Sequence, residues 1–145
     1  MRRLRLLVVA LASACGSPHG FIGPHPEWGG TWNLRSINGK SLPAPAPGLS
    51  FLFRPGELIG SVTVLTSVLT LRGDGTYVES SSISLATGAT EGHVELGWWE
   101  DFFALGIALS DRGVVDTSGS GMLVGDTLTI THGIPQNALT LRYTR

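Results

Sequence analysis

The stretch SVTVLTSVLTLRGDGTYVESSSISL, residues 61–85, decides the fold class of this chain. Two runs rich in Val, Thr, Leu and Ser, residues 61–72 and 76–85, enclose the triplet GDG at 73–75. β-Branched residues favour strands, and a Gly-Asp-Gly triplet between two such runs is typical of a hairpin turn. We therefore expect an antiparallel β-hairpin here.

Six further runs of strand-forming residues lie outside this hairpin, and no helix-length segment separates them. Short connections between successive strands predict antiparallel neighbours. Eight such strands with alternating apolar residues can close into a barrel, which leaves no exposed edge. We predict an all-β, lipocalin-like up-and-down barrel of about eight antiparallel strands, with a two-sheet sandwich as the alternative. The six runs are residues 30–37, 92–99, 103–109, 114–124, 127–131 and a last run around 139–143.

Two segments need separate treatment. Apolar residues recur at helical spacing over residues 98–109, so a helix there is the alternative to a hairpin that turns at Glu100 and Asp101. Residues 41–60 contain four prolines, which exclude a central strand and predict a long loop.

The N-terminus has the order of segments found in export signals. Three arginines within the first five residues precede an apolar run at residues 6–12, and Ala12-Ser13-Ala14 stands directly before Cys15. The apolar run is shorter than the roughly 20 residues that a spanning helix needs. A cysteine at this point is similar to the acylated cysteine of bacterial lipoproteins, so we expect lipidation of Cys15. Cleavage by ordinary signal peptidase, which would yield a secreted protein, is the alternative.

These features divide the chain into a signal peptide (residues 1–14), a lipid-anchor tether (15–29) and a barrel domain (30–145). Cleavage would remove three of ten basic side chains and leave eleven acidic ones, so the net charge would fall from −1 to about −4. Nucleic-acid binding needs a basic stripe, so we expect no nucleic-acid partner. Cys15 is the only cysteine, which excludes an intramolecular disulfide. We expect the protein in the bacterial cell envelope, held to the membrane by its lipid.

Three pieces of the domain resemble small bacterial lipocalin-like lipoproteins, many of which are uncharacterised. They are GTWNLRSINGKSLP at 30–43, LTLRGDGTY at 69–77, and GDTLTIT with LTLRYTR within 125–145. The G-x-W at residues 30–32 resembles the first lipocalin motif. The resemblance implies that Trp32 packs at the closed end of a barrel with a basic residue of the last strand across it. Arg142 is the nearest candidate for that barrel-closing role, and Arg145 is the alternative.

The resemblance also implies a small apolar or amphipathic ligand in the barrel, with the loop at residues 41–60 as a lid. Large side chains at suitable strand positions, Trp32, Tyr77, Trp99 and Phe103, are the candidate ligand-binding residues. The alternative is a non-catalytic interaction or structural module with a packed barrel and an apolar patch at residues 49–53.

We expect no catalytic residue, metal or cofactor. The sequence contains no G-x-S-x-G elbow, no phosphate-binding loop and no H-E-x-x-H motif. Glu100 and Asp101 are adjacent in a strand pattern, so they point to opposite faces and cannot flank one bond. His93 and Glu95 share a strand face, which we expect to be the outer one. Two histidines of the tether, His19 and His25, are interpreted as incidental.

Overall fold

The computed structural model of the chain describes residues 27–47, 62–101, 106–111, 119–132 and 138–145. These residues form ten strands and no helix. The strands are β1 (Gly30–Ile37), β2 (Lys40–Ser41), β3 (Ala44–Pro45), β4 (Thr63–Leu71), β5 (Thr76–Ser84), β6 (Thr90–Asp101), β7 (Ile107–Asp111), β8 (Gly119–Val124), β9 (Thr127–His132) and β10 (Leu139–Thr144).

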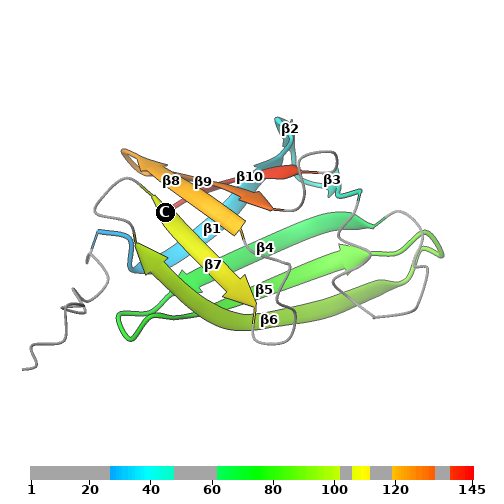
Figure 1. The fold of residues 1–145 in the computed structure, drawn as a ribbon. Coiled ribbons are helices and arrows are strands. Elements are labelled where there is room, and N and C mark those ends of the chain that lie inside the picture. The colour runs from blue at the N-terminus through cyan, green and yellow to red at the C-terminus, as the bar shows by residue number, and fades with distance from the viewer. Residues whose placement is uncertain (1–26, 48–61, 102–105, 112–118, 133–137) are drawn as a thin grey trace, which may run out of the picture.

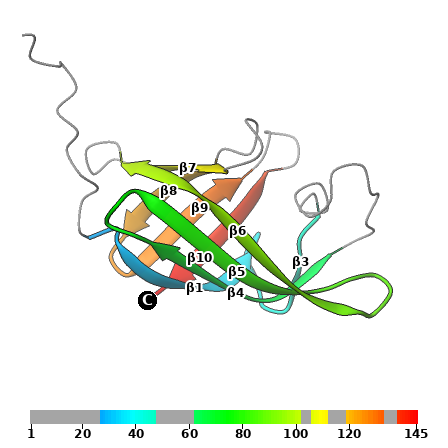
Figure 2. The ribbon, with the colours of Figure 1, turned by 90° about the horizontal axis from the view of Figure 1, so that it is seen from below.

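Eight of these strands close into an antiparallel barrel. Strands β4 to β10 each pair with the next along the chain, and β1 pairs with both β10 and β4 (Figures 1 and 2). This second pairing of β1 closes the sheet, so the predicted up-and-down barrel is confirmed and the two-sheet sandwich is excluded. The short strands β2 and β3 are additions, paired with β1 and β4.

The predicted turn chemistry accounts for two of the tight connections. The hairpin between β4 and β5 turns at residues 73–75, where Asp74 Oδ1 accepts hydrogen bonds from the backbone N–H and the hydroxyl of Thr76. Between β1 and β2, Asn38 and Gly39 have φ angles of 49° and 78°. A two-residue turn with both central residues at positive φ matches the twist of a hairpin, and Asn-Gly is the pair best suited to it.

Strand β6 differs from its predicted length. Glu100 and Asp101 continue the strand and pair with Ala108 and Ile107 of β7, so they do not form the expected turn. A helix over residues 98–109 is also excluded, because 98–101 and 107–109 are strand. Residues 102–105, which include Phe103, lie outside the described set.

The barrel interior is apolar at one end, which we call the tryptophan end. Trp28, Trp32 and Trp99 are all almost completely buried there. Trp32 Nε1 donates to the carbonyl of Trp28 at 3.0 Å, and Trp99 Nε1 donates to the carbonyl of Arg72 at 2.9 Å. The rings therefore join the start of β1 to the β4–β5 turn and fill this end of the barrel with side chains.

Candidate ligand pocket

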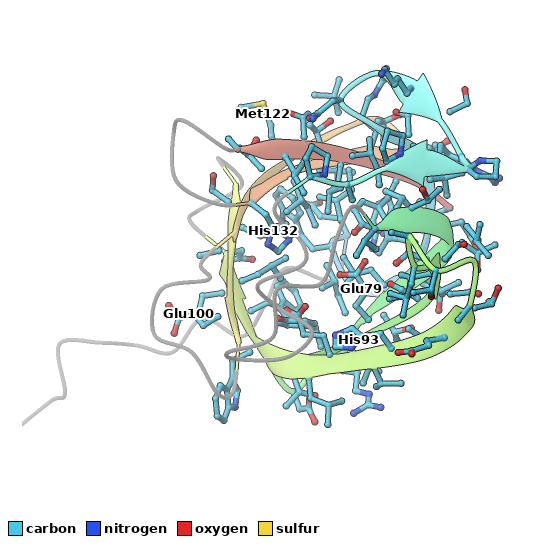
Figure 3. The ribbon with its side chains drawn as sticks, turned by 90° about the vertical axis from the view of Figure 1, so that its right-hand side faces the viewer. Glu79, His93, Glu100, Met122 and His132 are labelled. Carbon is cyan, nitrogen blue, oxygen red and sulfur yellow. The ribbon has the colours of Figure 1, made fainter. Side chains whose placement is uncertain are left out.

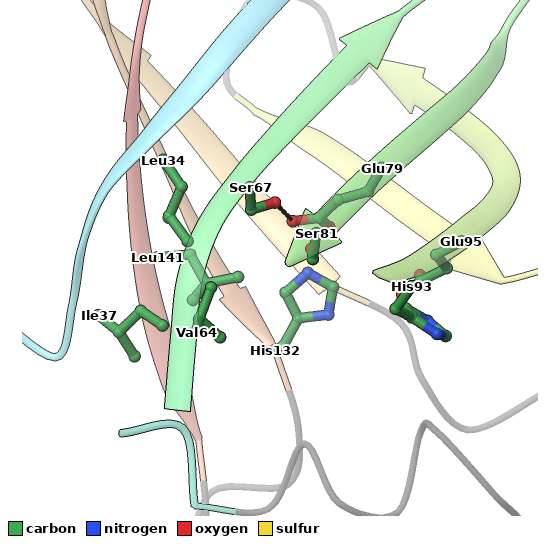
Figure 4. A pocket seen from close by; sticks show the side chains of 10 residues that line it. All are labelled: Leu34, Ile37, Val64, Ser67, Glu79, Ser81, His93, Glu95, His132 and Leu141. Atoms are coloured by element: carbon green, nitrogen blue, oxygen red, sulfur yellow. Dashed lines mark hydrogen bonds between the residues drawn. The ribbon is translucent and has the colours of Figure 1, made fainter. Parts of the chain in front are cut away.

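A pocket enters the barrel from the end opposite the tryptophans (Figure 4). Its empty space is about 470 Å³ when the part open to solvent is included. The centres of water-sized spheres can occupy about 30 Å³ of it, which is room for about two water molecules or a small polar headgroup. The lining residues are Leu34, Ile37, Val64, Ser67, Glu79, Ser81, His93, Glu95, His132 and Leu141.

Two irregularities of the strands decide which side chains face the pocket. The pairing register of β1 shifts between Leu34 and Ser36, and that of β4 shifts between Val64 and Thr66. Such bulges insert one extra residue and reverse the alternation beyond it. After the shift in β4, Ser67 lies on the inner face and Thr66 is exposed. Ile37 of β1 likewise contributes to the apolar wall.

Glu79 and Glu95 are paired directly across β5 and β6, and both line the pocket. Directly opposed strand residues have Cβ atoms about 5 Å apart, and like charges at such positions destabilise the sheet. Among the described residues that line the pocket, none is a lysine or an arginine. The pocket therefore presents two neighbouring carboxylates.

Hydroxyl groups from the barrel wall hold both carboxylates in place. Glu79 Oε1 accepts hydrogen bonds from Ser67 Oγ at 2.5 Å and from the Tyr143 hydroxyl at 2.8 Å. Glu95 Oε1 accepts one from the Tyr77 hydroxyl at 2.5 Å. Burial, followed by the nearby charge of Glu79, raises the pKa of Tyr143 well above its usual value. Tyr143 therefore remains a protonated donor and fixes Glu79.

His132, the last residue of β9, points into the barrel together with Glu79, whereas Glu100 and Met122 point away from it (Figure 3). It is 7% exposed, and its buried Nε2 atom has no hydrogen-bond partner. Burial lowers the pKa of His132, opposed by the charge of Glu79, so the ring is neutral. Gly119 makes room for this ring, because a Cβ at that position would lie 3.1 Å from its Cε1 and Nε2 atoms.

The predicted ligand-binding residues occupy three kinds of place. Trp32 and Trp99 belong to the tryptophan end and do not line the pocket. Tyr77 lies beneath the pocket and supports it through its bond to Glu95. Phe103 is outside the described residues, as are Cys15, residues 1–26, and the 48–60 part of the predicted lid loop.

The basic residue over the Trp32 ring is Arg145. Its guanidinium carbon lies 4.4 Å from the ring centroid, and Nη2 donates to the carbonyls of Glu27 and Gly29. Arg142 is exposed on the outer face of β10, because strand alternation separates it from the inward Leu141 and Tyr143. The barrel-closing role predicted for Arg142 is therefore corrected to Arg145.

The folded body also includes residues assigned to the tether. Trp28 is 2% exposed and packs in the core, and residues 27–29 accept the hydrogen bonds of Arg145 and Trp32. The barrel thus holds three residues that precede the boundary predicted at Gly30.

The outer-face interpretation of His93 and Glu95 is wrong, because both residues line the pocket. Glu100 is exposed and Asp101 is half-buried on the opposite side of β6, in keeping with their predicted separation. In the described part of the chain, no three His, Cys, Asp or Glu side chains come together as a metal site. The same residues contain no helix that is long and apolar enough to cross a membrane.

Sequence analysis missed Ser67, Glu79 and His132 as pocket residues. A usable signal was present for Glu79, because counting in steps of two from the large aromatic Tyr77 places it on the inner face. No comparable signal marked Ser67, which depends on the bulge in β4, or His132, which stands at the end of its strand.

No protein-family model, curated protein or solved structure matches this chain. The likeness to lipocalin-like lipoproteins therefore rests on the short sequence pieces quoted above and on the barrel itself.

Proposed function

We propose that this chain is an exported, lipid-anchored, lipocalin-like protein that binds a small amphipathic molecule non-covalently in its barrel. The observation that carries the proposal is the buried, unpartnered Nε2 atom of His132 in the pocket wall. A buried polar group without a partner costs about 1–3 kcal/mol, and a barrel with only a structural role gains nothing from it. A ligand that supplies the missing partner offsets this cost.

The two kinds of pocket wall support an amphipathic ligand. Leu34, Ile37, Val64 and Leu141 form an apolar side, while the carboxylates, serines and histidines form a polar one. Ligand pockets commonly combine apolar walls with a few placed polar groups that orient the ligand. In this proposal the ligand lays its apolar part on the first side and turns its polar end to the second. No bond is made or broken.

Native mass spectrometry of the full-length protein, extracted gently in detergent, tests the proposal. A small molecule carried by the wild-type protein should be lost in Ser81→Phe, which fills the pocket from β5. It should be retained in Ser80→Phe, because the neighbouring Ser80 is exposed on the outer face. A molecule carried equally by both variants would place the binding site elsewhere and contradict the proposal.

The proposed location is the bacterial envelope, with the protein anchored through acylated Cys15. The order of basic, apolar and small residues before this single cysteine supports it. Two or three acyl chains hold a protein on a membrane durably, where one chain binds reversibly.

A row of exposed apolar side chains on β6 favours a second candidate, a non-catalytic protein-interaction module. Val94, Leu96 and Trp98 are 60%, 44% and 46% exposed on the outer face of this strand. Contiguous apolar residues on a surface often mark a contact site. A photo-cross-linking residue at position 96 should then give one discrete adduct in the envelope, and one at the exposed Lys40 should give none. Equal cross-linking at both positions would contradict this candidate.

A further inference from the structure

The charge of the pocket selects the chemical class of its ligand. Glu79 and Glu95 are opposed across two strands, and their hydrogen bonds to Ser67, Tyr143 and Tyr77 keep both on the pocket floor. The hydroxyls bonded to Glu79 both use Oε1, and no described residue donates to its Oε2. A negatively charged headgroup would be repelled by this floor, whereas a cation would relieve the repulsion between the carboxylates.

The buried Nε2 atom of His132 adds an independent polar contact at the same place. It lines the same pocket as the two carboxylates and has no partner within the protein. A neutral imidazole has one nitrogen that accepts a hydrogen bond. With Nε2 as the acceptor, the pocket offers three acceptor groups: two carboxylates and one imidazole nitrogen.

We propose that the pocket takes a protonated primary amine with a short apolar chain, an inference that rests on the ligand-binding function proposed above. A primary ammonium has three N–H donors, which match Glu79, Glu95 and His132 as acceptors. It is also a compact charge, suited to the small space at the pocket floor. The alkyl chain then lies along Leu34, Val64 and Leu141 toward the open end.

A metal ion fits these residues less well than an ammonium group does. The described residues bring no three metal-ligating side chains together, and an ammonium group uses the directed hydrogen bonds that the hydroxyl-held carboxylates offer.

Isothermal titration calorimetry of the full-length chain with hexylammonium, hexanol and hexanoate separates the alternatives, because the three probes share one chain and differ in headgroup. We expect hexylammonium to bind at least about tenfold more tightly than either of the others. Equal binding of all three would overturn the amine proposal and leave ligand binding standing. Binding of none of them would overturn both.

Matched variants locate the effect. Glu79→Gln and Glu95→Gln keep an acceptor for the hydroxyls but remove a charge, so each should weaken hexylammonium at least about tenfold and hexanol much less. Glu100→Gln, on the exposed outer face of β6, should leave all affinities unchanged. Urea midpoints of the three variants report whether each is folded. A folded Glu79→Gln and a folded Glu95→Gln that both keep wild-type affinity for hexylammonium would overturn the proposal.

Discussion

The guanidinium group of Arg145 lies 4.4 Å from the centre of the Trp32 ring and thereby joins the last residue of the chain to the first barrel strand. Trp32 is completely buried, and its Nε1 atom donates to the carbonyl of Trp28. Arg145 also donates to backbone carbonyls of residues 27 and 29. The two ends of the barrel sequence are thus held together where β1 meets β10.

Arg145→Ala should lower the free energy of unfolding by about 1–2 kcal/mol, because it removes a cation–π contact and hydrogen bonds to two carbonyls. Arg142→Ala is the matched control: Arg142 is exposed on the outer face, so the change should stay within about 0.5 kcal/mol. Urea unfolding of both variants measures the difference. A larger loss in Arg142→Ala would contradict the assignment of Arg145.

Gly97→Ala should destabilise the barrel by about 2–3 kcal/mol through overpacking. A Cβ at this position would lie 2.2 Å from the carbonyl oxygen of Ser110 and 2.5 Å from Cε1 of Tyr77. Gly92→Ala, on the same strand with no atom within 4 Å of the added Cβ, should change stability by no more than about 0.5 kcal/mol. Thermal or urea unfolding distinguishes them, and equal effects would show that Tyr77 does not pack across β6.

Acidification should destabilise the protein through His132. Burial lowers the pKa of this residue in the folded protein, so the unfolded chain binds the proton more readily. Stability is therefore fully present above the unfolded pKa of about 6.5 and falls as the pH drops below it, with a slope of at most about 1.4 kcal/mol per pH unit.

Urea midpoints measured between about pH 5 and 7.5 test this expectation. His132→Gln should remove this component of the slope in that window. Asp74, whose pKa is lowered by its bonds to Thr76, titrates at more acidic pH and does not interfere. An identical slope in the variant would mean that His132 does not titrate as its burial requires.

Cys15 should carry lipid when the full-length chain is expressed in a bacterial host. Intact mass should show loss of residues 1–14 and gain of a diacylglyceryl and an acyl group, with the protein in the membrane fraction. Cys15→Ser should abolish the added mass, because serine lacks the acylated thiol. An unmodified chain that begins at Cys15 would instead identify a secreted protein.

Local patterns carried the prediction of the fold. Asn38-Gly39 and the turn at residues 73–75 lie where the sequence places them, because the φ angles that such turns need are set by the turn residues themselves. Alternation of apolar residues then separated an inner from an outer face along the last strand, where Leu139, Leu141 and Tyr143 are buried.

The length of β6 and the identity of the pocket residues could not be predicted in the same way. Glu100 and Asp101 are poor strand formers, yet pairing with β7 keeps them in the ladder. Ser67 faces the interior only because β4 contains a bulge, and bulges arise from the fit between neighbouring strands.

The sequence by itself determined an all-β chain of short antiparallel strands, because turn residues and the two-residue period act over a few neighbours. Only the tertiary structure decided that Glu79, Glu95 and His132 share one pocket and that Arg145 covers Trp32. These groups come from strands far apart in the chain. Their meeting depends on how the closed barrel registers its strands, and no local pattern specifies that register.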